Sequence, residues 1–204
     1  MVDINFDKKF KKPIVGIDEV GRGSWAGPVV ACAALLNYNK PLHKNLNDSK
    51  KLSPKTRFEI FESLKVNTYF GIGKSSSNEI DNFGIQKATF KAMERAFLDL
   101  RKKIDPVKIS TLLIDGNQDP YFQDKFGANI KLIIKGDTLS PSIAAASILA
   151  KCTRDLHMSE MDTIYDGFGF STNMGYGTKI HKNKLLSSGP TQIHRMTFSP
   201  MKQI

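Results

Sequence analysis

The sequence predicts an α/β fold in which a central mixed sheet is flanked by helices and followed by a small helical or flap region at the C-terminus. Two observations predict it: apolar runs of strand length recur along the chain, and stretches with helical periodicity lie between them. Such alternation is typical of α/β architecture. A chain of 204 residues can bury one sizeable core, so we expect a single domain over residues 1–204, with residues 160–204 as a helical extension.

The first three predicted strands lie in the N-terminal third of the chain. Residues 14–18 form an apolar run that ends in two acids, residues 28–36 are continuously apolar, and residues 66–72 alternate in hydrophobicity. Runs of this length and pattern favour strands, and the second is apolar enough to be a buried one. We expect these three strands to form a meander.

The middle of the chain predicts a helix followed by two strands and a second helix. Residues 85–100 carry apolar side chains at spacings of three and four, which is typical of an amphipathic helix facing the core. Residues 111–114 and 130–134 are apolar strands, and each is followed by an aspartate beside a glycine. Residues 140–154 predict a helix that Ser140 can cap and whose small residues permit close packing.

The last forty residues are glycine-rich and basic. Glycines at 167, 169, 175 and 177 precede a short basic helix predicted for residues 179–186. Gly189-Pro190 then interrupts regular secondary structure. We expect this part to form a mobile flap or an appended subdomain.

The charge of the chain favours a polyanionic partner. Thirty Lys and Arg residues stand against 20 Asp and Glu, which gives a net charge of +10 and a pI near 9.5. Such an excess favours binding to phosphates, and nucleic acid is the first candidate. The alternative is that the extra lysines only keep the protein soluble. The glycine-rich segment GRGSWAG at 21–27 lacks both the lysine followed by Ser or Thr of a Walker A loop and the G-x-G-x-x-G spacing, which argues against ATP and NAD as ligands.

Cysteine usage and the N-terminal sequence favour a cytoplasmic protein. Cys32 and Cys152 lie in stretches rich in Ala, Val, Leu and Ile, where a free thiol behaves as a small buried hydrophobe. The first residues lack the apolar core of a signal peptide, and no apolar run approaches the roughly 20 residues that span a bilayer. We therefore expect no association with a membrane.

Four acids follow predicted strands. Asp18 and Glu19 end the first strand, Asp115 ends the fourth, and Asp137 follows the fifth. Ligand sites in α/β sheets gather at the carboxyl ends of strands, so these acids can converge although they lie far apart in sequence. Four carboxylates can hold two divalent ions about 4 Å apart, as in metal-assisted reactions at phosphates. The alternative for each single acid is an ordinary loop residue or helix cap.

The acid cluster has an electrostatic consequence, and a glycine turn follows its first two acids in the sequence. Mutual repulsion would raise the pKa of some of its acids before metal binds, and bound cations would restore full ionisation. Directly after Asp18-Glu19, Gly21-Arg22-Gly23 forms a tight basic turn whose backbone can approach a ligand closely, because glycine places no side chain there. Carboxylates and a turn suited to phosphate therefore lie side by side.

Seven motifs in a fixed order give the chain a resemblance to the ribonuclease HII family. They are GIDEVGRGSWAGPVV at 16–30, DSKKLS at 48–53, LLIDG at 112–116, KGD at 135–137, SIAAASILAKCTRD at 142–155, GYGTKIH at 175–181 and GPTQIHR at 189–195. The resemblance implies a ribonuclease H-like fold with a substrate-binding C-terminal extension. It also implies cleavage 5′ to a ribonucleotide in an RNA/DNA hybrid or in duplex DNA, leaving 3′-hydroxyl and 5′-phosphate ends, for ribonucleotide removal and RNA primer degradation.

The resemblance also assigns roles to single residues. It makes Asp18, Glu19, Asp115 and Asp137 the ligands of Mg²⁺ or Mn²⁺. The residues it assigns to substrate binding are Gly21, Arg22 and Gly23 at the ribose 2′-hydroxyl, Tyr176 stacked on the next sugar, and Lys50, Lys51, Lys151 and Arg154 along the duplex phosphates. The roles of Asp155, His181 and His194 stay open.

Two alternatives remain at this point. The sister family, ribonuclease HIII, normally adds an N-terminal substrate-binding domain, whereas about a dozen residues precede the first predicted strand here. Tyr176 within GYGT also favours HII. A non-catalytic nucleic-acid-binding protein would need only the basic charge, and its acids would be structural. We expect a monomer whose partner is nucleic acid.

Overall fold

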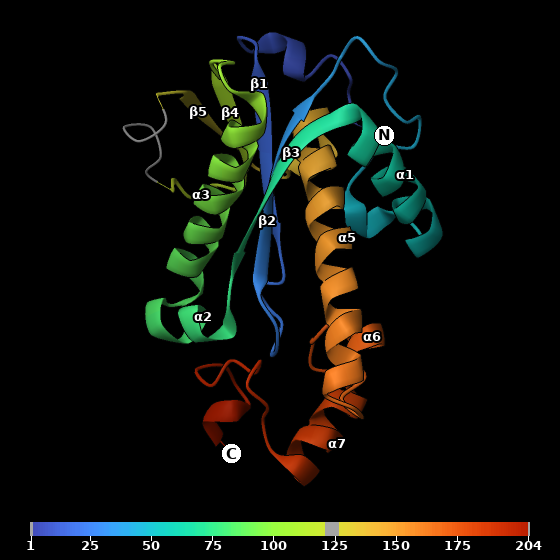
Figure 1. Ribbon diagram of the computed structural model, residues 1–204, viewed down its shortest axis with the longest axis vertical. Helices are drawn as coiled ribbons and strands as arrows, with labels where there is room; N and C mark the ends of the chain where they lie inside the picture. The colour runs from blue at the N-terminus through green and yellow to red at the C-terminus, as the bar shows by residue number, and fades with distance from the viewer. Residues whose placement is uncertain (1, 121–126, 204) are drawn as a thin grey trace.

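The structure, a computed structural model, describes residues 2–120 and 127–203 and is built on one five-stranded mixed sheet (Figure 1). Its strand order is β3-β2-β1-β4-β5. The strands are β1 (Ile14–Val20), β2 (Val29–Leu36), β3 (Thr68–Ser75), β4 (Thr111–Asp115) and β5 (Asn129–Ile133). Strands β1, β2 and β3 form the expected antiparallel meander, while β4 runs parallel to β1 and β5 parallel to β4.

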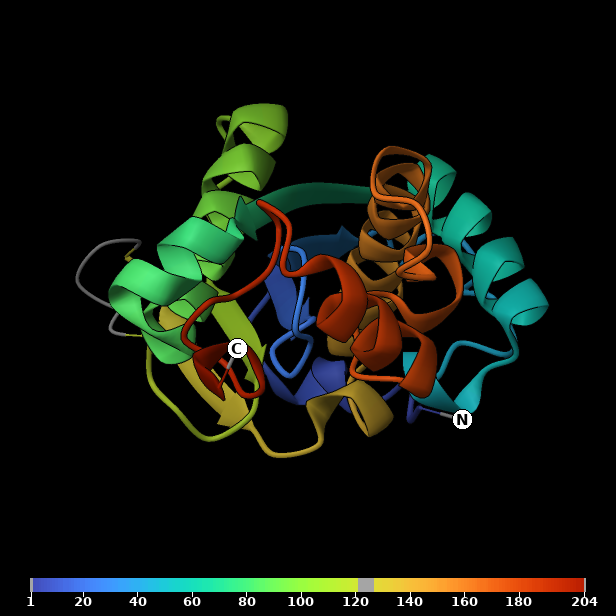
Figure 2. The same ribbon diagram turned by 90° about the horizontal axis from the view of Figure 1, so that it is seen from below.

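Helices cover both faces of this sheet (Figure 2). Helix α3 (Ile85–Ile104) packs on one face, where Phe97 and Leu100 contribute to a buried cluster, and α2 (Ser77–Phe83) precedes it. Helices α1 (Pro54–Asn67) and α5 (Pro141–Ile164) cover the other face through a second cluster. The α/β fold class predicted from the sequence is therefore confirmed.

Helix α5 is seated directly on the strand that carries Asp18. A Cβ atom added to Gly16 of β1 would lie 2.2 Å from the backbone carbonyl carbon of Ser142, so only glycine allows this approach. Ser140 caps the helix by accepting a hydrogen bond from the Ile143 N–H at 3.2 Å, as the sequence predicts. Close packing at this point fixes the distance between β1 and the loop before α5.

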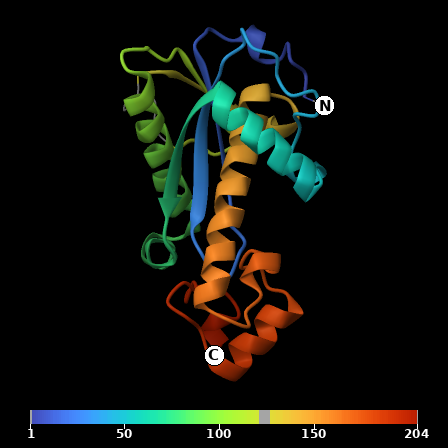
Figure 3. The ribbon, with the colours of Figure 1, turned by 45° about the vertical axis from the view of Figure 1, so that its right-hand side comes forward.

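Two helical segments differ from the sequence prediction. Helix α5 continues to Ile164, about three turns beyond residue 154, and thereby reaches the C-terminal elements (Figure 3). Packing of Met158, which is fully buried against the C-terminal region, stabilises the distal part of the helix. Helix α1 was not predicted, because only Ile60, Phe61 and Leu64 are buried in a segment that is otherwise polar or exposed.

The C-terminal region packs on the far end of α5 and contains α6 (Phe170–Asn173) and α7 (Lys179–Ser188). Its core combines Phe168, Phe170 and Leu185 with Ala26 of the loop after β1. Backbone hydrogen bonds add to this contact, since Trp25 N donates to the Gly175 carbonyl at 2.8 Å. Among residues 2–120 and 127–203, no helix is long and apolar enough to cross a membrane.

Candidate active site

Three of the four predicted acids converge at one edge of the sheet. Asp18 lies near the end of β1, Asp115 ends β4, and Asp137 lies in the 3-10 turn η3 (Gly136–Thr138) after β5. One carboxylate oxygen from each lies within 4.8 Å of the other two. The parallel pairing of β1, β4 and β5 produces this convergence, because the carboxyl ends of parallel strands share one edge.

Backbone hydrogen bonds hold two of these carboxylates in place. Asp18 Oδ1 accepts from the Glu19 N–H at 2.7 Å, and Asp115 Oδ1 accepts from the Gly136 N–H at 2.7 Å. The second bond ties β4 to the turn that carries Asp137. Lys135, directly before this turn, has a left-handed backbone (φ 56°), so the chain bends sharply there. The site is thus ordered by its own backbone.

Glu19 does not belong to the converging group of three. Its Oε1 accepts from the Arg22 guanidinium at 3.3 Å, so the side chain is directed toward the glycine turn. Its side chain is nevertheless 13% exposed and close enough for Asp115 to act on its charge. Its role as a metal ligand stays a prediction.

The acids repel one another in a poorly solvated place. Burial, then Glu19 and Asp115, raises the pKa of Asp18 well above its ordinary value. Burial, then Asp115 and Asp48, raises the pKa of Asp137, and burial also raises that of Glu19. Desolvation and like charge both disfavour the ionised form. The expected increase in pKa is therefore present in the structure.

One lysine partly compensates this charge. Lys50 Nζ lies 3.7 Å from Asp137 Oδ2, and the Lys50 side chain is 79% exposed. Partial burial would lower the pKa of Lys50, but the carboxylates around it, Asp137 first, raise it overall. An exposed lysine is a weak counter-ion, because it is strongly hydrated and flexible. Buried oxygen donors with an excess of negative charge suit a hard divalent cation.

The raised pKa values predict how stability depends on pH. The folded acids bind protons more tightly than the unfolded ones, so the metal-free protein loses stability as the pH rises through the ordinary carboxyl range and the raised values above it. In chelator, Asp137→Asn should raise the melting temperature at about pH 8 by roughly 2–4 °C and change it little at low pH. Thermal unfolding of both proteins across this range measures the difference. An Asp137→Asn protein that is less stable at high pH would contradict the repulsion.

The glycine turn and Tyr176 lie next to each other beside the acids. A Cβ atom added to Gly23 would lie 3.9 Å from Tyr176 Cε1. Tyr176 is 39% exposed. Gly21 has φ +91°, a conformation that disfavours other residues. Arg22 is exposed and paired with Glu19. The structure therefore brings together the residues predicted to contact a ribonucleotide.

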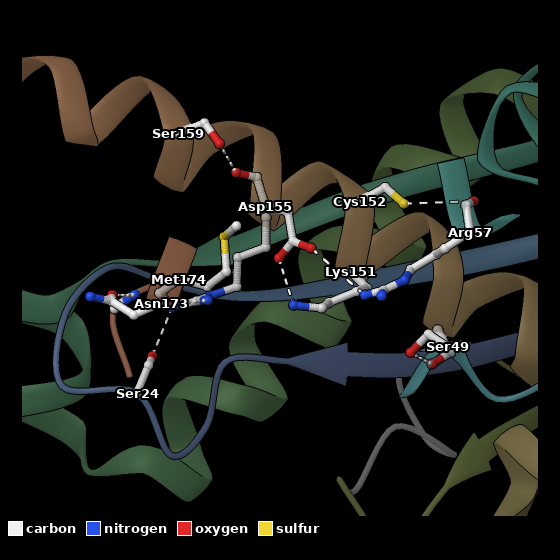
Figure 4. Close-up of polar contacts among 12 residues, drawn as sticks. Ser24, Ser49, Arg57, Lys151, Cys152, Asp155, Ser159, Asn173 and Met174 are labelled. Carbon is white, nitrogen blue, oxygen red and sulfur yellow. Dashed lines mark hydrogen bonds and ion pairs between the residues drawn. The ribbon is translucent and has the colours of Figure 1, made fainter. Parts of the chain in front are cut away.

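The predicted phosphate-contacting lysines differ in exposure. Lys50 and Lys51 are exposed in the turn η2 (Ser49–Lys51) beside the acids. Lys151 is only 18% exposed, and its Nζ lies 2.7 Å from Asp155 Oδ1. Figure 4 shows Lys151 and Arg57 both directed toward Asp155, with Arg57 Nη1 at 3.9 Å from its other oxygen. Asp155 is thus the counter-ion of two basic side chains.

The predicted contact between Arg154 and duplex phosphates is wrong for this structure. Arg154 has no exposed surface. Its guanidinium donates to the carbonyls of Pro28, Met174 and Ala26 at 2.8–3.1 Å and to Ser24 Oγ at 2.7 Å. These bonds join α5 to the loop after β1 and to the C-terminal region. Arg154 is a structural residue because it is buried and each of its three guanidinium nitrogens donates to a group inside the protein.

Several residues at or near the site were not predicted from the sequence. Asp48 is buried, accepts from the Lys50 N–H at 2.9 Å and raises the pKa of Asp137. Ser147 of α5 hydrogen-bonds Asp18.

Three residues of the C-terminal region were also not predicted. His181 and His194 form a buried pair. Arg195 donates to the carbonyls of Gly21 and Arg22 at 2.6 and 2.8 Å. All belong to the motifs quoted above, but only three-dimensional contacts reveal what they touch.

The fold and the site together define a metal-dependent hydrolase that acts on nucleic acid. Its buried carboxylates lie at the ends of parallel strands, with basic side chains and a glycine turn beside them. The family described as Ribonuclease HII matches the chain over residues 15–201, and the chain belongs to this family. It is therefore an endoribonuclease of the ribonuclease H type that acts on RNA/DNA substrates and needs a divalent metal.

Named relatives agree over nearly the whole chain. The ribonuclease HII of Ehrlichia ruminantium (strain Welgevonden) is 45% identical over 192 residues, which cover 94% of this chain and 87% of the relative. That of Wolbachia pipientis wMel is 40% identical and covers 98% and 97%. That of Pelagibacter ubique (strain HTCC1062) is 42% identical and covers 95% and 99%.

Solved structures share the fold at lower identity. The ribonuclease HII of Archaeoglobus fulgidus, solved in a complex with PCNA, gives a TM-score of 0.74 at 23% identity and covers 91% of this chain and 94% of that one. Bst-RNase HIII, solved with Mn²⁺, gives 0.76 at 19% identity and covers 93% and 68%. These likenesses show a ribonuclease H-like fold, as the resemblance implied.

Proposed function

We propose that the protein hydrolyses the phosphodiester 5′ to a ribonucleotide, both in RNA/DNA hybrids and at single ribonucleotides in duplex DNA. The products carry 3′-hydroxyl and 5′-phosphate ends, and the activity serves ribonucleotide removal and RNA primer degradation. The observation that carries the proposal is the convergence of Asp18, Asp115 and Asp137 within 4.8 Å. Membership of the ribonuclease HII family supports it.

The acids would hold two divalent cations, Mg²⁺ or Mn²⁺, with Glu19 as the fourth ligand. Bound cations supply an activated water and stabilise charge on the leaving 3′ oxygen. The carboxylates contribute hard oxygen donors whose positions the backbone already fixes. Lys50, whose side chain is largely exposed and whose Nζ lies 3.7 Å from Asp137 Oδ2, would contact a substrate phosphate beside the acids. Lys51 and Lys151 would neutralise phosphates of the duplex.

The turn of Gly21, Arg22 and Gly23 and the ring of Tyr176 would distinguish RNA from DNA. The 2′-hydroxyl is the chemical difference between the two, and a backbone turn can approach it closely. An aromatic ring can stack on the flat, apolar face of the next deoxyribose. Support comes from the proximity of Gly23 to Tyr176 and from the exposure of the ring.

Tyr176→Ala is expected to slow cleavage at a lone ribonucleotide by roughly tenfold to a hundredfold, the size of one aromatic stacking contact. Duplex affinity should fall much less, because the phosphate contacts remain. Single-turnover rates and binding of an uncleaved duplex, measured side by side, separate the two effects. Tyr176→Phe keeps the ring and should cleave nearly as wild type, while the exposed Tyr69→Ala on β3 is a control. Equal rates for Tyr176→Ala and wild type would remove Tyr176 from the mechanism.

We further propose that the protein is a cytoplasmic monomer. Cys32 and Cys152 are buried and free, as is usual for cysteines in the reducing cytoplasm. Light scattering of the purified protein tests the monomer.

A further inference from the structure

Two histidines outside the acid cluster form a buried pair in the C-terminal region. His181 of α7 is 0% exposed and His194 is 2% exposed, and their Nε2 atoms lie 2.9 Å apart. The rings of Phe168, Phe170 and Trp25 surround them at centroid distances of 5.1–6.0 Å. Such an apolar setting disfavours charge. Burial lowers the pKa of His181, and burial together with His181 lowers that of His194 to about 4.

The contacts of the pair allow one arrangement of protons. The Thr191 N–H donates to His194 Nδ1 at 2.9 Å, so Nδ1 is an acceptor and neutral His194 carries its proton on Nε2. That proton is donated to His181 Nε2, which must then be unprotonated. His181 consequently carries its proton on Nδ1 and donates it to the Tyr176 carbonyl at 3.0 Å. The bonds run in one direction, from Thr191 to Tyr176.

This chain of hydrogen bonds ends at Tyr176, the residue proposed to stack on the sugar of the next nucleotide. The Tyr176 N–H donates to the Asn173 carbonyl at 2.9 Å, and its own carbonyl also accepts from the Thr178 N–H at 2.8 Å. With the bond from His181, the backbone on both sides of the ring is fixed. The side chain extends to solvent beside Gly23, with the Arg154 guanidinium 5.8 Å from the ring centroid. The backbone therefore determines where the ring can meet a nucleotide.

The residue after His194 fixes the opposite part of the same site. Arg195 is fully buried, and its Nη2 and Nη1 donate to the carbonyls of Gly21 and Arg22. Its backbone N–H donates to the Trp25 carbonyl at 2.9 Å. The dipeptide His194-Arg195 thus contacts the glycine turn directly and Tyr176 through His181.

We propose that His181 and His194 are positioning residues that set Tyr176 against the glycine turn and thereby determine selectivity for a ribonucleotide followed by a deoxyribose. The inference rests on the proposed function of Tyr176. Both histidines are buried and lie outside the group of converging acids, so in this proposal neither contacts nucleic acid or metal. Their contribution is geometric: they hold a backbone carbonyl through a hydrogen-bond chain with a fixed direction.

Two substitutions of His181 separate the bond to Tyr176 from the bond to His194. The amide of Asn can take the place of Nδ1 and donate to the Tyr176 carbonyl, whereas the amide of Gln reaches the position of Nε2 and leaves that carbonyl with the Thr178 N–H but without its side-chain donor. His181→Gln should lower kcat/KM at a lone ribonucleotide by about tenfold, the size of one hydrogen bond, and His181→Asn by much less. Each variant loses one of the two hydrogen bonds that the His181 ring makes, so similar melting temperatures are expected for both variants.

A double-mutant cycle with Tyr176→Ala decides whether His181 acts through Tyr176. If it does, His181→Gln causes no further loss in the Tyr176→Ala background. The same tenfold loss in both backgrounds, or equal losses for the Asn and Gln variants, would overturn the relay, by which we mean the hydrogen-bond chain from His194 through His181 to the Tyr176 carbonyl. The role of Tyr176 itself would stay intact. Wild-type rates for Tyr176→Ala alone would instead remove the proposed function of Tyr176, and the relay with it.

Nitrogen NMR of the histidines in the unmodified protein gives a test that does not depend on how variants fold. The relay requires His194 protonated on Nε2 and His181 protonated on Nδ1, both neutral near pH 7. The opposite tautomer on either ring, or a charged ring, would break the direction of the chain and overturn the proposal.

Discussion

Asp115→Asn is expected to abolish cleavage of RNA/DNA duplexes, with a loss of about 10³-fold or more in kcat, while duplex affinity stays nearly unchanged. The asparagine keeps an oxygen that can accept from the Gly136 N–H, so the turn carrying Asp137 should remain in place. It removes one of the three charges that converge within 4.8 Å. The loss therefore reports on cation binding and not on folding.

A matched variant controls for charge alone. Glu59→Gln removes one negative charge from the exposed face of α1 without touching the site and should cleave as wild type. Cleavage rates at saturating enzyme and affinity for an uncleavable duplex give the two quantities. Retention of wild-type cleavage by Asp115→Asn would refute a metal role for the strand-end acids.

Arg154→Met is expected to lower the free energy of unfolding by about 3 kcal/mol or more. Methionine fills much of the space but leaves three buried acceptors, on Ser24, Ala26 and Pro28, and the half-buried carbonyl of Met174 without the guanidinium donor. Unsatisfied buried acceptors are costly because they have also lost water. Denaturant unfolding measures the change.

Lys182→Met on the exposed surface of α7 removes the same charge and should leave stability unchanged. If Arg154 contacted duplex phosphates, Arg154→Met would behave like this control in unfolding and would instead weaken binding with a shallower dependence on salt. That result would reverse the structural assignment of Arg154.

Elements with strong local patterns were predicted well from the sequence. Helix α3 follows the apolar spacing of residues 85–100 to within a turn, and the strands β1, β2 and β4 begin and end within two residues of their apolar runs. Helix α1 escaped prediction because tertiary packing of three buried residues, and not periodicity, keeps it in place. The last three turns of α5 likewise depend on contacts with the C-terminal region.

The site was predictable where it depends on topology. Asp18, Asp115 and Asp137 follow apolar strands, and parallel pairing brings such ends together. Burial of single polar residues was not predictable. Arg154 and Lys151 occupy one helix three residues apart, yet one is enclosed by carbonyls and the other pairs with Asp155. Nor does the sequence indicate that His181 and His194, thirteen residues apart, share a hydrogen bond.

Cleavage of an end-labelled DNA duplex containing one ribonucleotide, with Mg²⁺, with Mn²⁺ and with chelator, tests the central claim most directly. All-DNA duplex and RNA/DNA hybrid are the controls. We predict a cut immediately 5′ of the ribonucleotide that requires either metal, leaves a 3′-hydroxyl and does not occur in all-DNA duplex. Binding of these duplexes without cleavage under either metal would contradict the claim and make the converging acids structural residues.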